Sequence, residues 1–310
     1  MAVLCLLAAC GGDSGARRFV SLGTAPAGGA FFVVGSALSE VLDQAQEGWE
    51  VNAESTKGSQ ENIRRLDSGE LDFGLANSAI TYFAVRGESG WEKAYPMRSV
   101  MTLAPNVALF VTPANSGIQS IADLRGKRVV VGPAGAGFEH FLGPLLEAHG
   151  LSYDDFRPLN NSQAGAVDLL ADGAASAAFL GGAVPTSSII QASSSQDIFF
   201  IPYGDAEREE LVQRYPFFRQ ATIPAQTYRG QEEDYTGLDV GSMHLITRAD
   251  LDEEMVYQVT KILYENREQV VARHAAGRSI RAENVVRDLG TEFHPGAVRY
   301  YKEIGIWKGE

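Results

Sequence analysis

The sequence lacks cysteine over almost its whole length, and it lacks the short motifs that mark common enzymes. Cys5 and Cys10 are its only cysteines, so the chain beyond them has neither a disulfide framework nor a cysteine-based metal site. There is no G-x-S-x-G elbow, no H-E-x-x-H pair and no lysine-containing phosphate loop. The glycines of residues 132–137 have the wrong spacing for a dinucleotide-binding turn. These absences argue against an enzyme, and we expect no metal and no cofactor.

Basic residues are also scarce. The chain has 26 Lys and Arg against 39 Asp and Glu, a formal net charge of −13, and no basic cluster carries interleaved aromatic residues. This balance argues against nucleic-acid binding. The histidines have no metal-ligand spacing, and we expect each at a helix end or on the surface: His140, His149, His244, His274 and His294.

The first ten residues, MAVLCLLAAC, are apolar throughout and end in small residues before Cys10. This order is typical of a bacterial lipoprotein signal, in which Cys10 is lipidated and the segment containing Cys5 is removed. No basic region precedes the run, which is short for a signal peptide. The polar GGDSGARR follows, so we assign residues 1–18 to a signal segment and tether, and expect a lipid-anchored protein in the periplasm or on the cell surface. A buried N-terminal strand is the alternative.

Two glycine-rich turns each lie between a strand-like run and a helix-like run, in residues 19–42 and 127–151. Such a turn lets backbone N–H groups and a helix N-terminus point at one spot, which favours an anionic ligand. Two of them, far apart in the chain, predict two similar lobes that face each other over a cleft. The length of 310 residues also favours two domains, and no stretch beyond Cys10 approaches the roughly 20 apolar residues of a membrane span.

Strands and helices alternate along the chain, which predicts an α/β fold with parallel sheets. The predicted strands are residues 19–22, 49–55, 71–76, 128–131, 175–180 and 198–203. The main predicted helices are residues 30–46, 60–68, 165–172, 206–215 and 252–274, the last with Asp250 as its cap, and a final helix starts at His294. The segments 107–112 and 241–247 are extended, and we expect them to cross between the lobes. The first lobe is then residues 19–106 plus 248–310, and the second, inserted lobe is residues 107–247.

Six segments match one protein family in their order along the chain. They are GTAPAGGAFFVVGSALSEVL, STKGSQENIRRLDSGELDFGLANSAITYFAVRG, IQSIADLRGKRVVVGPAGAGFE, GGAVPTSSI, IPAQTYRGQEED and FHPGAVRYYKEIGIW. Together they resemble the TAXI family, the extracytoplasmic solute-binding subunits of tripartite (TRAP-type) transporters. NIRRLDSGELDFG and HPGAVRYYKE are the most specific parts of the match, which spans residues 19–307.

The resemblance implies a type II periplasmic-binding-protein fold, in which two α/β lobes are joined by two crossing strands and hold the ligand in the cleft between them. It also implies capture of a small organic anion, either a carboxylate or an amino acid, and delivery to TRAP-type membrane permease subunits. We expect a monomer. The alternative function is a ligand-sensing lipoprotein of the same fold that signals to a membrane receptor, and the sequence does not separate the two.

In the first lobe, Thr24 and Gly29 lie in the first glycine turn, where a hydroxyl and N–H groups would hold a carboxylate. The alternative is that this turn only permits tight packing of the strand on the helix. Phe31 and Phe32 lie where family members often carry tyrosines, and they would form an apolar wall or belong to the core.

Three further candidates follow in the first lobe. Lys57 replaces what is commonly a small residue in the family, and it would supply a positive charge or simply be solvated. Asn77 and Ser78 end the third strand and are expected at the cleft edge. Both residue types are also ordinary cap and turn residues.

In the second lobe, Ala136, Gly137 and Phe138 match a family motif that often has Ser and Thr at the first and third of these positions. Their backbone N–H groups remain as donors. Pro185 and Thr186 match a helix start that contributes ligand contacts in the family. The departures predict a pocket with fewer hydroxyls, and a ligand with an apolar portion against the phenylalanines.

Overall fold

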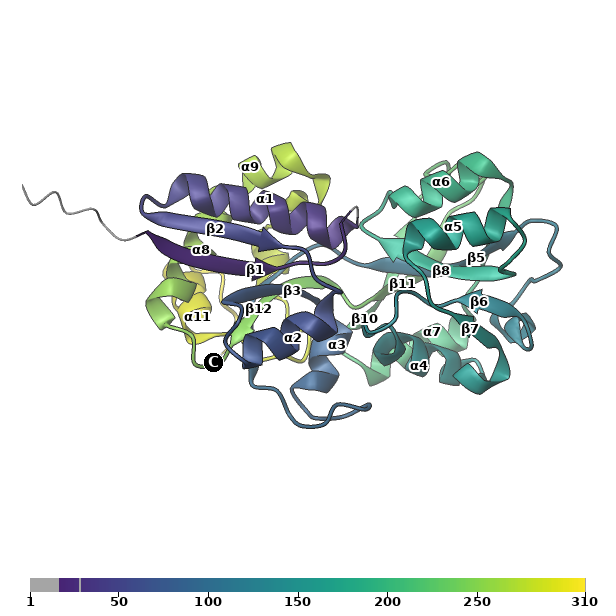
Figure 1. Ribbon diagram of the computed structural model, residues 1–310, viewed down its shortest axis with the longest axis horizontal. Coiled ribbons are helices and arrows are strands. Elements are labelled where there is room, and N and C mark those ends of the chain that lie inside the picture. Colours follow the sequence, from purple (N-terminus) through teal and green to yellow (C-terminus); the bar gives the residue numbers. More distant parts are fainter. Residues whose placement is uncertain (1–16, 28, 310) are drawn as a thin grey trace, which may run out of the picture.

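The computed structural model describes residues 17–27 and 29–309, and it has two α/β lobes side by side along the long axis of the molecule (Figure 1). The predicted lipidation site Cys10 and most of the predicted signal segment and tether lie outside these residues. In the part of the chain that the structure describes, no helix is long and apolar enough to cross a membrane.

The first lobe is built on a five-stranded sheet with the strand order β2-β1-β3-β12-β4. Its strands are β1 (Arg18–Gly23), β2 (Trp49–Glu54), β3 (Phe73–Asn77), β4 (Met97–Thr102) and β12 (Met243–Arg248). β1 pairs in parallel with β2 and β3, whereas β12 is antiparallel to β3 and β4. Its helices are α1 (Ala30–Ala45), α2 (Ser59–Asp67), α3 (Ser78–Ala84), α8 (Glu253–Glu265), α9 (Arg267–Arg273), α10 (Ala282–Val285) and α11 (Pro295–Glu303).

The second lobe has a sheet with the order β10-β11-β5-β8-β6-β7, and β9 also pairs with β5. Its strands are β5 (Val107–Pro113), β6 (Arg128–Val130), β7 (Arg157–Leu159), β8 (Ala177–Gly182), β9 (Ile198–Ile201), β10 (Phe218–Ile223) and β11 (Tyr235–Val240). Its α-helices are α4 (Glu139–Ala148), α5 (Gln163–Ala171), α6 (Ser187–Ser195) and α7 (Asp205–Arg214). β6, β7 and β8 form the parallel part expected of strands joined by helices.

Apolar periodicity explains why α1 forms where it does. Its buried side chains recur at helical spacing and face the first core: Val34, Ala37, Leu38, Val41 and Leu42. The long helix predicted for residues 252–274 is instead two helices, because α8 ends at Glu265 and α9 begins after Asn266. The prediction that Asp250 caps this helix was wrong. Asp252 is the N-cap of α8, because its carboxylate accepts the N–H of Met255.

The two crossovers between the lobes are short. The first is residues 103–106, between β4 and β5, and the second is residues 241–242, between β11 and β12. The predicted boundary after Thr247 was wrong, because β12 pairs with β3 and β4 in the first sheet. The two extended segments that were expected to cross are therefore strands of opposite lobes.

Aromatic side chains on and around α3 and α4 join the two lobes. Tyr82 and Phe83 of α3 lie against Phe217 of the second lobe, with ring centroids 5.1 and 5.7 Å away. His140, at the start of α4, is stacked 5.5 Å from Trp91 of the first lobe. One hydrophobic cluster therefore continues from α3 into the second lobe, while a separate cluster fills the rest of the first lobe.

Candidate functional site

A cavity of about 570 Å³ lies between the two lobes. The first lobe lines it with residues of the β1–α1 turn, the start of α2 and the start of α3, and the second lobe with the turn before α4 and the starts of α5 and α6. Asn106 of the first crossover also lines it. Both glycine turns that the sequence singled out thus reach one cavity.

Eight of the predicted site residues line this cavity: Gly29, Phe31, Lys57, Asn77, Ala136, Phe138, Pro185 and Thr186. Their role in ligand binding stays a prediction. Four others lie outside the lining, for reasons that are visible in the local geometry: Thr24, Phe32, Ser78 and Gly137.

Thr24 is a structural residue of the first turn. Its hydroxyl donates to the carbonyl of Glu54 at 2.7 Å, and its side chain is fully buried. Its own carbonyl accepts hydrogen bonds from the Asn62 amide at 2.7 Å and from the Thr56 hydroxyl at 3.1 Å. These bonds fix the turn at the end of β1, so the prediction that the Thr24 hydroxyl holds a carboxylate was wrong.

Phe32 and Ser78 also point elsewhere. With 3.6 residues per turn, Phe32 lies on the face of α1 opposite to Ala30, which lines the cavity. Ser78 is fully buried at the start of α3, and its N–H donates to the carbonyl of Ser242 at 3.0 Å. Neither residue is therefore placed to contact a ligand in the cavity.

Gly137 belongs to a contact between the lobes. Its φ is +90°, and a Cβ there would lie 3.0 Å from Cδ1 of Ile80 in the first lobe. Similar approaches bring a Cβ placed at Gly58 within 4.0 Å of the Ala136 Cβ, and one placed at Gly182 within 3.9 Å of the Ala30 Cβ. The two lobes therefore approach each other closely around the cavity.

Asn77 lines the cavity, but its side chain is engaged in the fold. Its Oδ1 accepts the N–H of Ala79, which caps α3 as the residue type predicts, and its amide donates to the carbonyl of Gly241 at 2.9 Å. Asn77 therefore ties the end of β3 to the second crossover.

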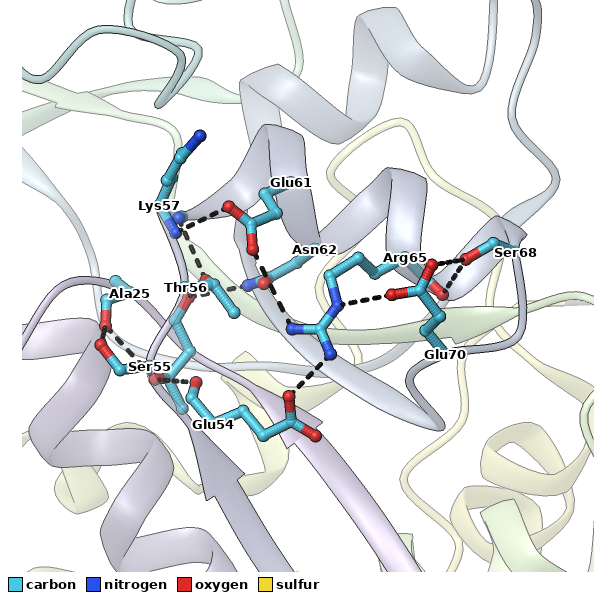
Figure 2. A network of polar contacts seen from close by, with 12 residues as sticks. Ala25, Glu54, Ser55, Thr56, Lys57, Glu61, Asn62, Arg65, Ser68 and Glu70 are labelled. Atoms are coloured by element: carbon cyan, nitrogen blue, oxygen red, sulfur yellow. Dashed lines mark hydrogen bonds and ion pairs between the residues drawn. The ribbon is translucent and has the colours of Figure 1, made fainter.

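Lys57 has a side chain that is free for a ligand. It is exposed, and its ammonium makes no hydrogen bond or ion pair within the described residues. Its backbone N–H donates to Glu61 at 3.1 Å, and Glu61 also lies 4.0 Å from the guanidinium of Arg65. Figure 2 shows the Lys57 side chain pointing away from these two residues. The positive charge of Lys57 is thus not cancelled by its neighbours.

Six helices start at the cavity. First-turn or cap residues of α1 to α6 belong to its lining. No side chain of the described residues caps α1, α2 or α6. Helix N-termini carry partial positive charge and free N–H groups, so their convergence favours an anion.

Sequence reasoning missed several polar residues of the lining. Gln163 and Ser188 are occupied, because the Gln163 amide binds both the N–H and the carbonyl of Gly181 and accepts the Ser188 hydroxyl at 2.6 Å. Asn106, Ser187 and Gln191 line the cavity with side chains that make no hydrogen bond among the described residues. Ser187 directly follows the predicted Thr186, and Asn106 ends the predicted first-lobe segment, so both positions could have been found.

Three of the histidines are buried rather than exposed. Burial lowers the pKa of His140 and of His294 below the usual value, and lowers that of His244 to about 3. His140 and His294 lie at helix starts as expected, but His244 lies within β12, where its Nε2 is 2.8 Å from the Thr81 hydroxyl. No group of three His, Cys, Asp or Glu side chains in the described part of the chain is arranged to hold a metal ion.

The fold is that of the periplasmic solute-binding proteins. The methylphosphonate complex of PhnD1 from Prochlorococcus marinus matches with a TM-score of 0.58 at 11% identity, over 93% of this chain and 96% of that one. A binding-protein component of an ABC phosphonate transporter from Pseudomonas aeruginosa matches with a TM-score of 0.55 at 12% identity, over 83% and 79%. The alkanesulfonate-binding protein SsuA from Xanthomonas axonopodis pv. citri, bound to MOPS, matches with a TM-score of 0.50 at 15% identity, over 93% and 91%.

The sequence itself defines a family within this fold. The model of the NMT1-like family matches residues 22–305, which covers nearly all of the described chain. The protein therefore belongs to the NMT1-like family.

Proposed function

We propose that this protein is an extracytoplasmic solute-binding lipoprotein that captures a small organic anion between its lobes, without catalysing a reaction. The observation that carries this proposal is the cavity, which is lined by the starts of helices α1 to α6 and by Lys57, whose ammonium has no partner among the described residues. Positive potential in a cleft between two lobes favours an anion such as a carboxylate.

The partner in this proposal is a TRAP-type membrane permease. Support comes from the six ordered segments that resemble the TAXI family, because they span the same part of the chain as the family match. The solved proteins of similar fold include a component of an ABC transporter, but their low identity concerns the fold alone. Co-purification with a TRAP-type permease encoded beside the gene would support the proposal, whereas co-purification with an ABC permease or a membrane receptor would contradict it.

Lipid anchoring through Cys10 completes the proposal. A multiply acylated cysteine anchors a protein stably, whereas one acyl chain binds marginally. Cys10→Ala should therefore move the protein from the membrane fraction to the soluble periplasmic fraction. A variant that stays with the membrane to the same degree would refute the anchor.

The experiment that tests ligand capture is a thermal-shift screen of residues 17–310 against organic acids and amino acids, followed by calorimetric titration of each hit. A ligand that binds only the folded state raises Tm by mass action. At a ligand concentration a hundred times Kd, the unfolding free energy increases by about 2.7 kcal/mol. We expect at least one anion to raise Tm. If no member of either class binds, the protein is not a receptor for these solutes.

A further inference from the structure

We propose that the cavity selects a singly charged organic acid that has an apolar body and no ammonium group, and that it discriminates against amino acids. We build here on the proposed function, in which a small anion binds between the lobes, and choose between its two ligand classes. Charge, helix orientation and the apolar walls each support this choice.

The charge at the cavity is opposite to that of the whole chain. The chain has 39 acidic and 26 basic residues, yet none of the described residues that line the cavity is acidic. The basic side chains among them are Lys57 and His274. An amino acid would bring its ammonium group out of water into a site with no carboxylate to pair with it, which is costly. A carboxylate brings the opposite charge.

Glu61 does not supply the missing carboxylate. It accepts the backbone N–H of Lys57 and faces Arg65, and Arg65 is held in addition by Glu54 at 2.7 Å and by Glu70 at 3.2 Å. In Figure 2 this network lies to one side of the Lys57 ammonium. Arg65 therefore holds Glu54, Glu61 and Glu70, whereas Asp239, which accepts the N–H of Asn106 at 3.0 Å, also accepts the Ser242 hydroxyl and lies 3.8 Å from the Arg287 guanidinium. Lys57 remains to balance a single negative charge on the ligand.

The helix starts at the cavity strengthen the same preference. Helix N-termini carry partial positive charge and their first-turn or cap residues line the cavity, so a bound ammonium would be repelled where a carboxylate is attracted. Donors are also available, because the hydroxyl of Ser187 and the amides of Asn106 and Gln191 are unoccupied within the described residues. These groups can complete the hydrogen bonds of a carboxylate.

The remaining walls are suited to an apolar body. Phe31, Ile80, Phe138 and Phe141 line the cavity, together with alanines and prolines. Its volume of about 570 Å³ falls within the range of roughly 300–1,000 Å³ that holds drug-sized ligands. An acid of two or three carbons would leave water against these aromatic faces, whereas an aromatic or long aliphatic acid would displace that water.

Matched probes separate the two ligand classes by calorimetric titration. 3-Phenylpropanoate and L-phenylalanine differ only in the α-ammonium, and hexanoate and L-norleucine form an aliphatic pair. We expect the acid of each pair to bind at least about tenfold more tightly than its amino acid, a difference of about 1.4 kcal/mol. We also expect propanoate to bind more weakly than 3-phenylpropanoate.

The opposite order within the pairs would overturn this proposal and leave the proposed function intact, because an amino acid would then be the captured solute. Equal binding of propanoate and 3-phenylpropanoate, or no binding by any of these probes, would contradict the inference that the ligand has an apolar body. Among the binding experiments, only the failure of the broad screen described above would remove the proposed capture of a small anion as well.

A charge variant tests the role given to Lys57. Lys57→Gln should weaken 3-phenylpropanoate about tenfold and flatten the dependence of Kd on NaCl concentration, because salt screens an exposed charge. Lys127→Gln is the control, since Lys127 is exposed in the second lobe and does not line the cavity. Equal Kd values and equal salt dependence in the two variants, both folded by circular dichroism, would contradict the assignment.

Discussion

At the scale of single residues, Thr24 and Ser187 show how side-chain direction decides the effect of a substitution. Thr24→Ala removes the 2.7 Å hydrogen bond to the Glu54 carbonyl and should cost about 1 kcal/mol of unfolding free energy. Ser187→Ala removes a free hydroxyl at the cavity, so it should leave stability nearly unchanged and weaken a carboxylate ligand roughly tenfold or more. Urea unfolding and calorimetric titration of both variants check this contrast. Loss of affinity in Thr24→Ala and loss of stability in Ser187→Ala would contradict the positions given to the two side chains.

His140 provides a prediction about pH. The ring is buried between Phe83 and Trp91, neither of its nitrogens has a hydrogen-bond partner in the described residues, and burial lowers its pKa. Glu139 lies 4.0 Å away and would favour the charged ring, whereas Arg64 disfavours it. Below about pH 6.5 the His140 ring is protonated in the unfolded chain but stays neutral in the folded protein. The unfolding free energy therefore falls as pH falls, by up to about 1.4 kcal/mol per pH unit.

His140→Phe keeps the aromatic contact and removes the titrating group. We expect its unfolding free energy to decline less steeply between pH 6.5 and 5 than that of the unaltered protein, with His244 and His294 still contributing. Urea titrations at several pH values give the two slopes. Parallel slopes would show that His140 is not held neutral in the folded state.

At the scale of elements, the second crossover depends on one glycine. Gly241 has a φ of +113°, and a Cβ there would lie 2.3 Å from Oδ1 of Asn77, the atom that caps α3. Gly241→Ala should therefore lower the unfolding free energy by roughly 2 kcal/mol more than the left-handed conformation alone costs.

Gly117→Ala is the matched control. Gly117 also has a positive φ, +77°, but a Cβ there would meet no heavy atom of the described residues within 4 Å. It should cost only the conformational penalty, about 1–2 kcal/mol. Equal losses in the two variants, measured by urea unfolding, would mean that the crossover tolerates a side chain.

The elements also show what the sequence can predict. Alternating apolar runs located most strands and helices, and the glycine turns located the cavity, because both signals are local. The partners of a strand are not local: β5 and β12 were both expected to cross between the lobes, yet they pair in different sheets. Side-chain direction is equally hidden, since Thr24 and Lys57 were both expected at the site and only Lys57 lines the cavity. The hairpin of β10 and β11 was not predicted.

At the scale of the whole molecule, the position of the cavity between two lobes predicts that ligand binding changes the distance between the lobes. Gly58, Gly137 and Gly182 lie where the two lobes approach each other closely, so a movement of one lobe against the other would widen or narrow the cavity between them. The crossovers at residues 103–106 and 241–242 are short enough to act as a hinge. Small-angle scattering should give a smaller radius of gyration with saturating ligand than without it, and an unchanged radius would indicate a rigid cleft.

The location of the bound anion is the central claim, and a crystal structure with the tightest-binding organic acid tests it most directly. We predict the ligand between the lobes, with its carboxylate near the Lys57 ammonium and the first turn of α6, and its apolar body against Phe138. A ligand bound outside this cavity, or a carboxylate turned away from both Lys57 and α6, would contradict the account.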